Sequence, residues 1–318
     1  MNQSGYNSDY EDVYKSPVLW MWLLAVFIGP SVVCYVFLLY HFFAIRTLRQ
    51  GINNHIVIVV LILGLMYTLI DIASSITYYR LHRQVWPQSP AFCYFWLWID
   101  YGVFNTITVL LAWGSFERHI LVFHHQLTNT RFKRIIFHYI PMYFILTYMT
   151  LYYTVLVFFY PCQNDWDYNW AVCGVDGCYH ENVIIAYFEL YFHGIIPMIA
   201  ITLFNIALLI RVMCHKRTAQ QRVAWKKYRK MAFQLLSIVA LYLSINFPLS
   251  AIDMLSLVGI NVEGQVSRII SFLGYHTIMF LPFVCLAGLP EVWKKVKGIF
   301  HITTAQIAPF QTQPNNNH

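Results

Sequence analysis

Residues 18–40 read VLWMWLLAVFIGPSVVCYVFLLY, a long apolar run without a charged side chain. The hydrocarbon core of a bilayer is about 30 Å thick, so a helix needs roughly 20 apolar residues to cross it. Strands of a membrane barrel alternate apolar and polar residues over about 10 positions, and this run does not alternate. The stretch therefore predicts a transmembrane helix.

Six further apolar runs follow, separated by polar or basic links. The seven runs cover residues 18–45, 55–79, 91–123, 135–160, 182–213, 231–253 and 267–289. We therefore expect an all-α membrane protein, a bundle of seven transmembrane helices. The flanking parts are a polar N-terminal segment (1–17), a short amphipathic helix on the membrane surface (290–300) and a disordered tail (301–318).

The composition argues against the other common classes of protein. Hydrophobic residues make up 58% of the 318 residues and charged residues 11%, with a mean hydropathy of +0.52. An ordinary soluble domain has about 45–50% apolar and about 25% charged residues. The histidines form no HExxH pattern and the serines no GxSxG pattern. We therefore expect neither an enzyme nor a metal or other cofactor.

Lysine and arginine are distributed unevenly between the two sides of the predicted bundle. With the N-terminus outside, 17 of the 21 Lys and Arg residues fall on the inner side. Cytoplasmic loops carry such an excess, which predicts an extracellular N-terminus, a cytoplasmic C-terminus and a multi-pass protein of the plasma membrane. The net charge of +7 then points to membrane lipid as a partner rather than to nucleic acid. This orientation also exposes a glycosylation sequon at Asn2.

Four of the seven cysteines, Cys93, Cys162, Cys173 and Cys178, fall on the predicted outer side. That side is oxidising, so we expect two disulfides there. A zinc site is the alternative use of these cysteines, although their spacing contains no CxxC pair. Four cysteines allow three pairings, and the spacing leaves all three open.

The third predicted helix places polar residues on one face. Residues 93 and 118 are 25 positions apart, about 37 Å of helix, so one lies at each membrane surface. Because positions seven apart nearly coincide around a helix, one stripe is expected to contain Cys93, Asp100, Ile107, Gly114 and Arg118.

These features together carry a family resemblance. With seven predicted helices, Cys93 at the top of the third and Glu117-Arg118-His119 at its base, the chain resembles a rhodopsin-like (class A) G-protein-coupled receptor. The sequences INNHIVIVVLILG, VWPQSPAFCYFWLWIDY and LLAWGSFERH resemble the expanded receptor sets of rotifers. Single prolines in helices five, six and seven match the same family: Pro197, Pro248 and Pro282.

The resemblance implies how the inner end would work. A heterotrimeric G protein would couple at Glu117, Arg118 and His119, and Glu117 would hold Arg118 in an ion pair at rest. It also implies a disulfide from Cys93 to the loop between helices four and five. We expect Cys178 as its partner, with Cys173 as the alternative; the Cys178 choice leaves Cys162 to pair with Cys173.

Acidic residues inside membrane spans are costly and point to function. The candidates are Asp71, Asp100, Glu189 and Asp253. The resemblance implies that Asp100 is the counterion of an amine and that Tyr275 bonds to it; the alternative is a purely structural bond between the two helices. Several acids suit a cationic ligand, either an amine or a small basic or amidated peptide. The expected ligand contacts are Asp100, Tyr275, Trp96, Tyr101, Glu189 and His193.

The chain also departs from the family. Gly64 and Asn246 stand where an aspartate and a tryptophan are usual, Tyr228 replaces an acid, and residues 281–285 read LPFVC in place of NPxxY. These departures favour, as an alternative, a non-signalling or atypically coupled receptor. A membrane transporter is a further alternative, although the sequence contains no internal repeat.

Overall fold

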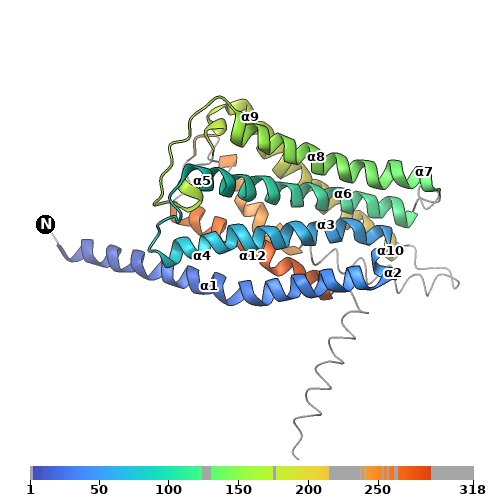
Figure 1. Ribbon diagram of the computed structural model, residues 1–318, viewed down its shortest axis with the longest axis horizontal. Helices are drawn as coiled ribbons and strands as arrows, with labels where there is room; N and C mark the ends of the chain where they lie inside the picture. The colour runs from blue at the N-terminus through green and yellow to red at the C-terminus, as the bar shows by residue number, and fades with distance from the viewer. Residues whose placement is uncertain are drawn as a thin grey trace, which may run out of the picture.

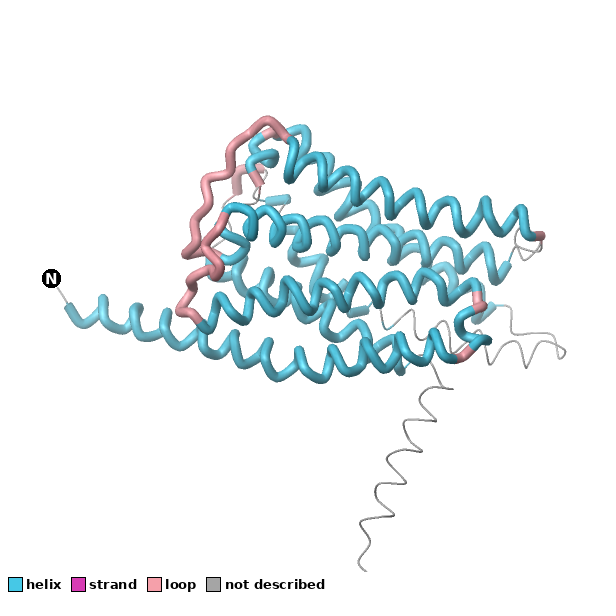
Figure 2. The backbone as a smooth tube through the Cα atoms, in the orientation of Figure 1, coloured by secondary structure: helices cyan, strands magenta, loops and turns pink. Residues whose placement is uncertain are grey.

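The computed structural model describes residues 3–123, 130–174, 177–214, 237, 240–241, 243–252, 254–255, 258–260 and 264–287. These residues form helices that lie side by side in a bundle, with loops at its two ends and no strand among them (Figures 1 and 2). In chain order the elements are α1 (Gln3–Ala44), α2 (Arg46–Arg49), α3 (Ile52–Tyr67), η1 (Thr68–Ile72), α4 (Ala73–Arg80), α5 (Pro90–Leu97), η2 (Trp98–Val103), α6 (Phe104–Phe123), α7 (Arg131–Arg134), η4 (Ile135–Tyr139), α8 (Ile140–Thr154), η5 (Val155–Phe159), η6 (Ala171–Gly174), η7 (Cys178–Glu181), α9 (Val183–Phe188), η8 (Glu189–Ile195), α10 (Ile196–Cys214) and α12 (Gly264–Ala287).

Consecutive elements join into helices that are long and apolar enough to cross a membrane. Six such spans are present: Pro17–Ala44, Asn54–Arg80, Pro90–Leu121, Arg131–Phe159, Val183–Arg211 and Ile269–Ala287. They correspond to six of the seven predicted runs, which confirms an all-α, multi-pass architecture. The predicted run 231–253 lies mostly outside the described residues, which include a shorter apolar helix, Leu243–Ile252. Asn2, Asp253, Tyr228 and residues 290–318 also lie outside them.

The two ends of the bundle are named here by a landmark residue. The disulfide end contains Cys93 and the loops beside α5 and α9, on the left in Figure 1. The Arg118 end contains α2, α7 and the last turns of α6, on the right. At the disulfide end, Ser89 begins α5: its hydroxyl accepts a hydrogen bond from the Phe92 amide at 3.3 Å, and Pro90 occupies the first turn. Both residues are favourable there because the first amides of a helix have no partner within it.

Within the described residues, five of the elements are π-helical turns: η1, η2, η4, η5 and η8. Four of them carry ionisable residues inside the spans: Asp71 in η1, Asp100 in η2, His138 in η4, and Glu189 with His193 in η8. A π turn bonds each amide five residues back, so it widens the helix and turns the following side chains. Such turns are frequent at functional sites.

Gly64 in α3 allows a close contact between three helices. A Cβ atom at this position would lie 2.4 Å from the Tyr35 hydroxyl oxygen. That hydroxyl crosses from α1 to donate a hydrogen bond to the Ile278 carbonyl of α12 at 2.8 Å. The Tyr35 side chain therefore fills the space next to the position where the family resemblance implies an aspartate.

Replacing Gly64 with alanine is expected to lower the free energy of unfolding by about 1–3 kcal/mol, because the added methyl group overpacks the Tyr35 contact. Gly29→Ala is the matched control, since nothing lies within 4 Å of a Cβ placed there. Thermal unfolding of both variants in detergent micelles measures the difference. Equal melting temperatures of the two variants would show that the Tyr35 side chain moves aside without a loss of stability.

Candidate functional site

A cavity of about 600 Å³ opens between the helices in the half of the bundle nearer the disulfide end. Its walls come from η2, α6, η8, α10, α12 and the helix Leu243–Ile252, with Tyr67 from α3 and His180 from the loop above. Sites for small ligands have volumes of about 300–1,000 Å³. The cavity therefore has room for a small organic ligand or the end of a peptide.

Asp100 lies in the wall of this cavity and is held by a phenol. The hydroxyl of Tyr67, across from α3, donates to Asp100 Oδ1 at 3.0 Å. Tyr275, the tyrosine expected to bond Asp100, lines the same cavity. The phenol that holds Asp100 in this structure is thus Tyr67 of the second span, and the bond expected from Tyr275 stays a prediction.

Asp71 is fully buried and does not line the cavity. The indole Nε1 of Trp96 donates a hydrogen bond to Asp71 Oδ1. Trp96 is 1% exposed, so the structure places this expected ligand contact in the core, bound to a neighbouring acid. Trp96 therefore lies outside the cavity wall in this structure, and its cation–π contact with a ligand stays a prediction.

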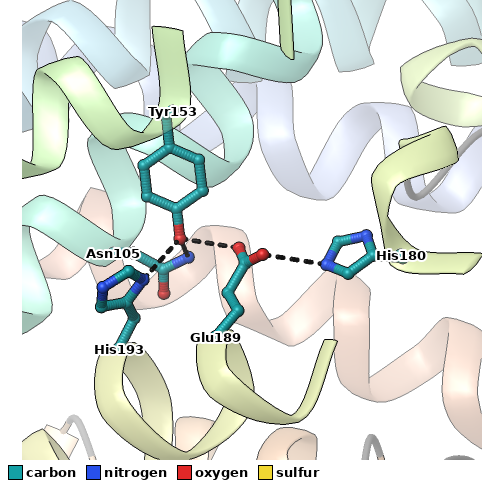
Figure 3. Close-up of polar contacts among 5 residues, drawn as sticks. All are labelled: Asn105, Tyr153, His180, Glu189 and His193. Atoms are coloured by element: carbon teal, nitrogen blue, oxygen red, sulfur yellow. Dashed lines mark hydrogen bonds and ion pairs between the residues drawn. The ribbon is translucent and has the colours of Figure 1, made fainter. Parts of the chain in front are cut away.

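Glu189 also lines the cavity and belongs to the polar cluster drawn in Figure 3. The Tyr153 hydroxyl donates to Glu189 Oε1 at 2.7 Å, and His180 Nε2 lies 3.0 Å from Oε2. Asn105 Nδ2 donates to the Tyr153 oxygen at 2.6 Å. Residues from α6, α8, η7 and η8 thus orient one carboxylate toward the cavity.

His193 lies behind Glu189 rather than in the cavity wall, and is 2% exposed. Its Nε2 lies 3.0 Å from the Tyr148 hydroxyl and its Nδ1 lies 3.3 Å from the Tyr153 hydroxyl. Because Tyr153 already donates its proton to Glu189, His193 Nδ1 carries a proton and donates it to the Tyr153 oxygen. His193 therefore supports Tyr153 and does not contact a ligand directly in this arrangement.

Of the six expected ligand contacts, four line the cavity: Asp100, Tyr101, Glu189 and Tyr275. Three polar residues that hold Asp100 and Glu189 were not predicted from the sequence: Tyr67, Tyr153 and His180. No signal in the sequence separates these two tyrosines from the other 21.

The disulfides differ from the expected pairing. Cys93 is bonded to Cys173, the alternative, and Cys162 is bonded to Cys178. Val172 and Cys173 adopt positive φ angles of 52° and 58°, and the Asp167 amide donates to the Cys173 carbonyl at 2.9 Å. This left-handed turn brings Cys173 over the start of α5. Cys178 stays beside Cys162, where its amide donates to Asn164 Oδ1 at 2.7 Å.

Proteolysis without reduction is expected to release one linked peptide pair containing Cys93 and Cys173, and another containing Cys162 and Cys178. Mass spectrometry before and after reduction identifies the pairs. A linked pair containing Cys93 and Cys178 would contradict the described loop.

At the Arg118 end, Glu117 is paired with a histidine. His138 Nδ1 forms a buried ion pair with Glu117 Oε1, and His138 Nε2 lies 2.8 Å from His55 Nδ1. His55 Nε2 lies 3.0 Å from the Arg49 carbonyl. In the described part of the chain Glu117 forms no ion pair with Arg118, so the expected resting pair is wrong. Neighbouring residues on a helix point about 100° apart and do not face each other.

The hydrogen-bond partners assign the protons in this chain of residues. The Arg49 carbonyl only accepts, so His55 Nε2 carries a proton, and in the neutral tautomer His55 Nδ1 accepts from His138 Nε2. One further proton then lies between His138 Nδ1 and Glu117. We name this set Glu117, His138 and His55 the histidine clasp; it joins α6, η4 and α3.

The other two residues expected to couple at this end are buried as well. Arg118 lines a small void with Ile56 and Leu281. The His119 ring bonds to the Phe204 carbonyl of α10 through Nε2. Gly114 and Arg118, both in α6, lie next to Ile56 of α3, and Asp100 bonds to Tyr67 at the end of α3. The three residues therefore face the same neighbouring helix, which agrees with the stripe expected on the third predicted helix.

The described residues contain no cluster of histidine, cysteine and acidic side chains arranged to hold a metal ion. The sequence matches no protein-family model, and no curated protein matches it either. The geometry of the site is thus the basis on which a function can be proposed.

Proposed function

We propose that this chain is a seven-helix receptor of the plasma membrane that binds an extracellular cationic ligand, an amine or a small peptide. The observation that carries the proposal is the Asp100 carboxylate, held by Tyr67 in the wall of a cavity of about 600 Å³. A carboxylate inside a membrane span is costly unless it is paired. A ligand ammonium group in the cavity would form an ion pair with this carboxylate.

The cavity wall supports this assignment in two further ways. Tyr101, Phe104 and Tyr275 lie in the wall with Asp100, and aromatic faces attract cations. Glu189, oriented by Tyr153 and His180, adds a second acceptor in the same cavity wall.

We propose that the Arg118 end passes the signal to a heterotrimeric G protein through Glu117, Arg118 and His119. Support comes from the resemblance at these residues and from the excess of Lys and Arg in the segments on that side. Such an excess favours a cytoplasmic location and acidic or anionic partners. In this view the Cys93–Cys173 bridge tethers the extracellular loop over the cavity.

The test is nucleotide exchange on a panel of G proteins, with the purified chain in lipid nanodiscs and libraries of amines and basic peptides. At least one cationic ligand is expected to accelerate exchange. A chain that binds a ligand but accelerates exchange on no G protein would be a non-signalling receptor. Ligand-driven ion or solute flux in reconstituted vesicles would instead identify a transporter.

A further inference from the structure

Asn246 is a buried polar residue whose side chain has no partner among the described residues. It lines the cavity from the helix Leu243–Ile252 and is 4% exposed. Neither its Nδ2 nor its Oδ1 forms a hydrogen bond, although both atoms are buried. Leaving a buried donor or acceptor unpaired costs about 1–3 kcal/mol. A side chain that is costly in the free protein and faces a binding cavity points to a ligand.

The chemistry of the amide specifies what that ligand group must offer. Nδ2 only donates and Oδ1 only accepts, so a full complement needs one acceptor and one donor side by side. A primary carboxamide supplies both, with its carbonyl toward Nδ2 and its N–H toward Oδ1. A carboxylate can only accept, and an ammonium group can only donate, so each would satisfy one of the two atoms.

We propose that Asn246 recognises a primary carboxamide on a ligand whose cationic group binds Asp100. This inference rests on the proposed function and narrows its ligand class to amino carboxamides, including peptides with an amidated end. Asp100 and Asn246 lie in the walls of the same cavity but on different helices, so one ligand can engage both. The Asn246 side chain is then a specificity-determining residue at the surface of the cavity.

The proposal is tested with three sets of probes of matched chain length: ω-amino carboxamides, alkylamines and ω-amino carboxylates. Binding is measured as the ligand-induced rise in melting temperature of the full chain in nanodiscs. The best carboxamide is expected to bind the wild type about tenfold more tightly than its matched alkylamine, from two added hydrogen bonds. The carboxylate is expected to bind most weakly, because Glu189 also lines the cavity.

Asn246→Leu is expected to remove the preference for the carboxamide while leaving alkylamine binding within about twofold, since no amide remains to pair. Without ligand, its melting temperature is expected to equal or exceed that of the wild type, because an unpaired polar group is replaced by an apolar one. Ser244→Ala, in the same helix but exposed and outside the cavity wall, is the matched control and is expected to keep the preference.

Two results would overturn the carboxamide inference and leave the proposed function standing. One is equal binding of carboxamide and alkylamine by the wild type, and the other is a clear fall in the ligand-free melting temperature of Asn246→Leu. The second result would mean that the amide is bonded within the protein or to water. Failure of the proposed function looks different. In that case no amine of any set binds, or Asp100→Asn binds every amine as well as the wild type does.

Discussion

Asp100→Asn is expected to weaken the binding of a cationic ligand by about 30-fold or more. Removing one partner of a buried charge pair costs about 2–5 kcal/mol, and each 1.4 kcal/mol is a factor of about ten in affinity. The substitution keeps the shape of the side chain and an acceptor for the Tyr67 hydroxyl, so the wall of the cavity should persist. Ligand titration of the purified variant gives the ratio.

Asp165→Asn is the control for the Asp100 variant. It removes the same charge from an exposed loop at the same end of the bundle, outside the cavity. Its affinity is expected to stay within about twofold of the wild type, because exposed charges are screened by water and salt. If the two variants lost affinity equally, general electrostatic attraction would account for binding, and Asp100 would not be the counterion.

His138→Leu is expected to lower the free energy of unfolding by about 3–5 kcal/mol. The substitution leaves Glu117 buried without its ionic partner, and breaking one side of a buried pair has this cost. Glu117→Gln alone is expected to be mild, because a glutamine amide can donate to His138 Nδ1. The double variant is expected to be more stable than His138→Leu, since no buried charge remains unpaired.

Thermal unfolding of the four proteins in this cycle measures the coupling between Glu117 and His138. His41→Leu is the matched control, a histidine near the same end of the bundle whose ring bonds within its own helix. A small loss for His138→Leu, or no recovery in the double variant, would mean that the histidine clasp does not hold Glu117. An ion pair between Glu117 and Arg118 would then be the better explanation of how Glu117 is held.

The six described spans could be predicted from the sequence because each is an apolar run longer than a membrane core. The acids of the cavity wall could be predicted for a related reason: Asp100 and Glu189 are ionisable residues in apolar surroundings, which are rare without a function. Both signals are properties of single residues and their neighbours along the chain.

Features that depend on contacts between distant segments could not be predicted in this way. The phenols of Tyr67 and Tyr153 are two of 23 tyrosines, and only the packing of the helices selects them. His138, which pairs with Glu117 in the histidine clasp, lies in the π turn η4. A pattern based on the regular helical repeat does not predict the change in side-chain direction that a π turn produces. The left-handed turn at Val172 and Cys173 decided the disulfide pairing, yet neither residue type is typical of positive φ.

The proposed function requires that the cavity containing Asp100 faces the outside of the cell and that Arg118 lies toward the cytoplasm. It is tested most directly by single cysteines introduced at two exposed positions, Asp165 at the disulfide end and Arg131 at the Arg118 end. Intact cells are treated with a membrane-impermeant maleimide, with the unaltered chain as background. Asp165→Cys is expected to be labelled in intact cells and Arg131→Cys only after permeabilisation; the reverse pattern would contradict the account.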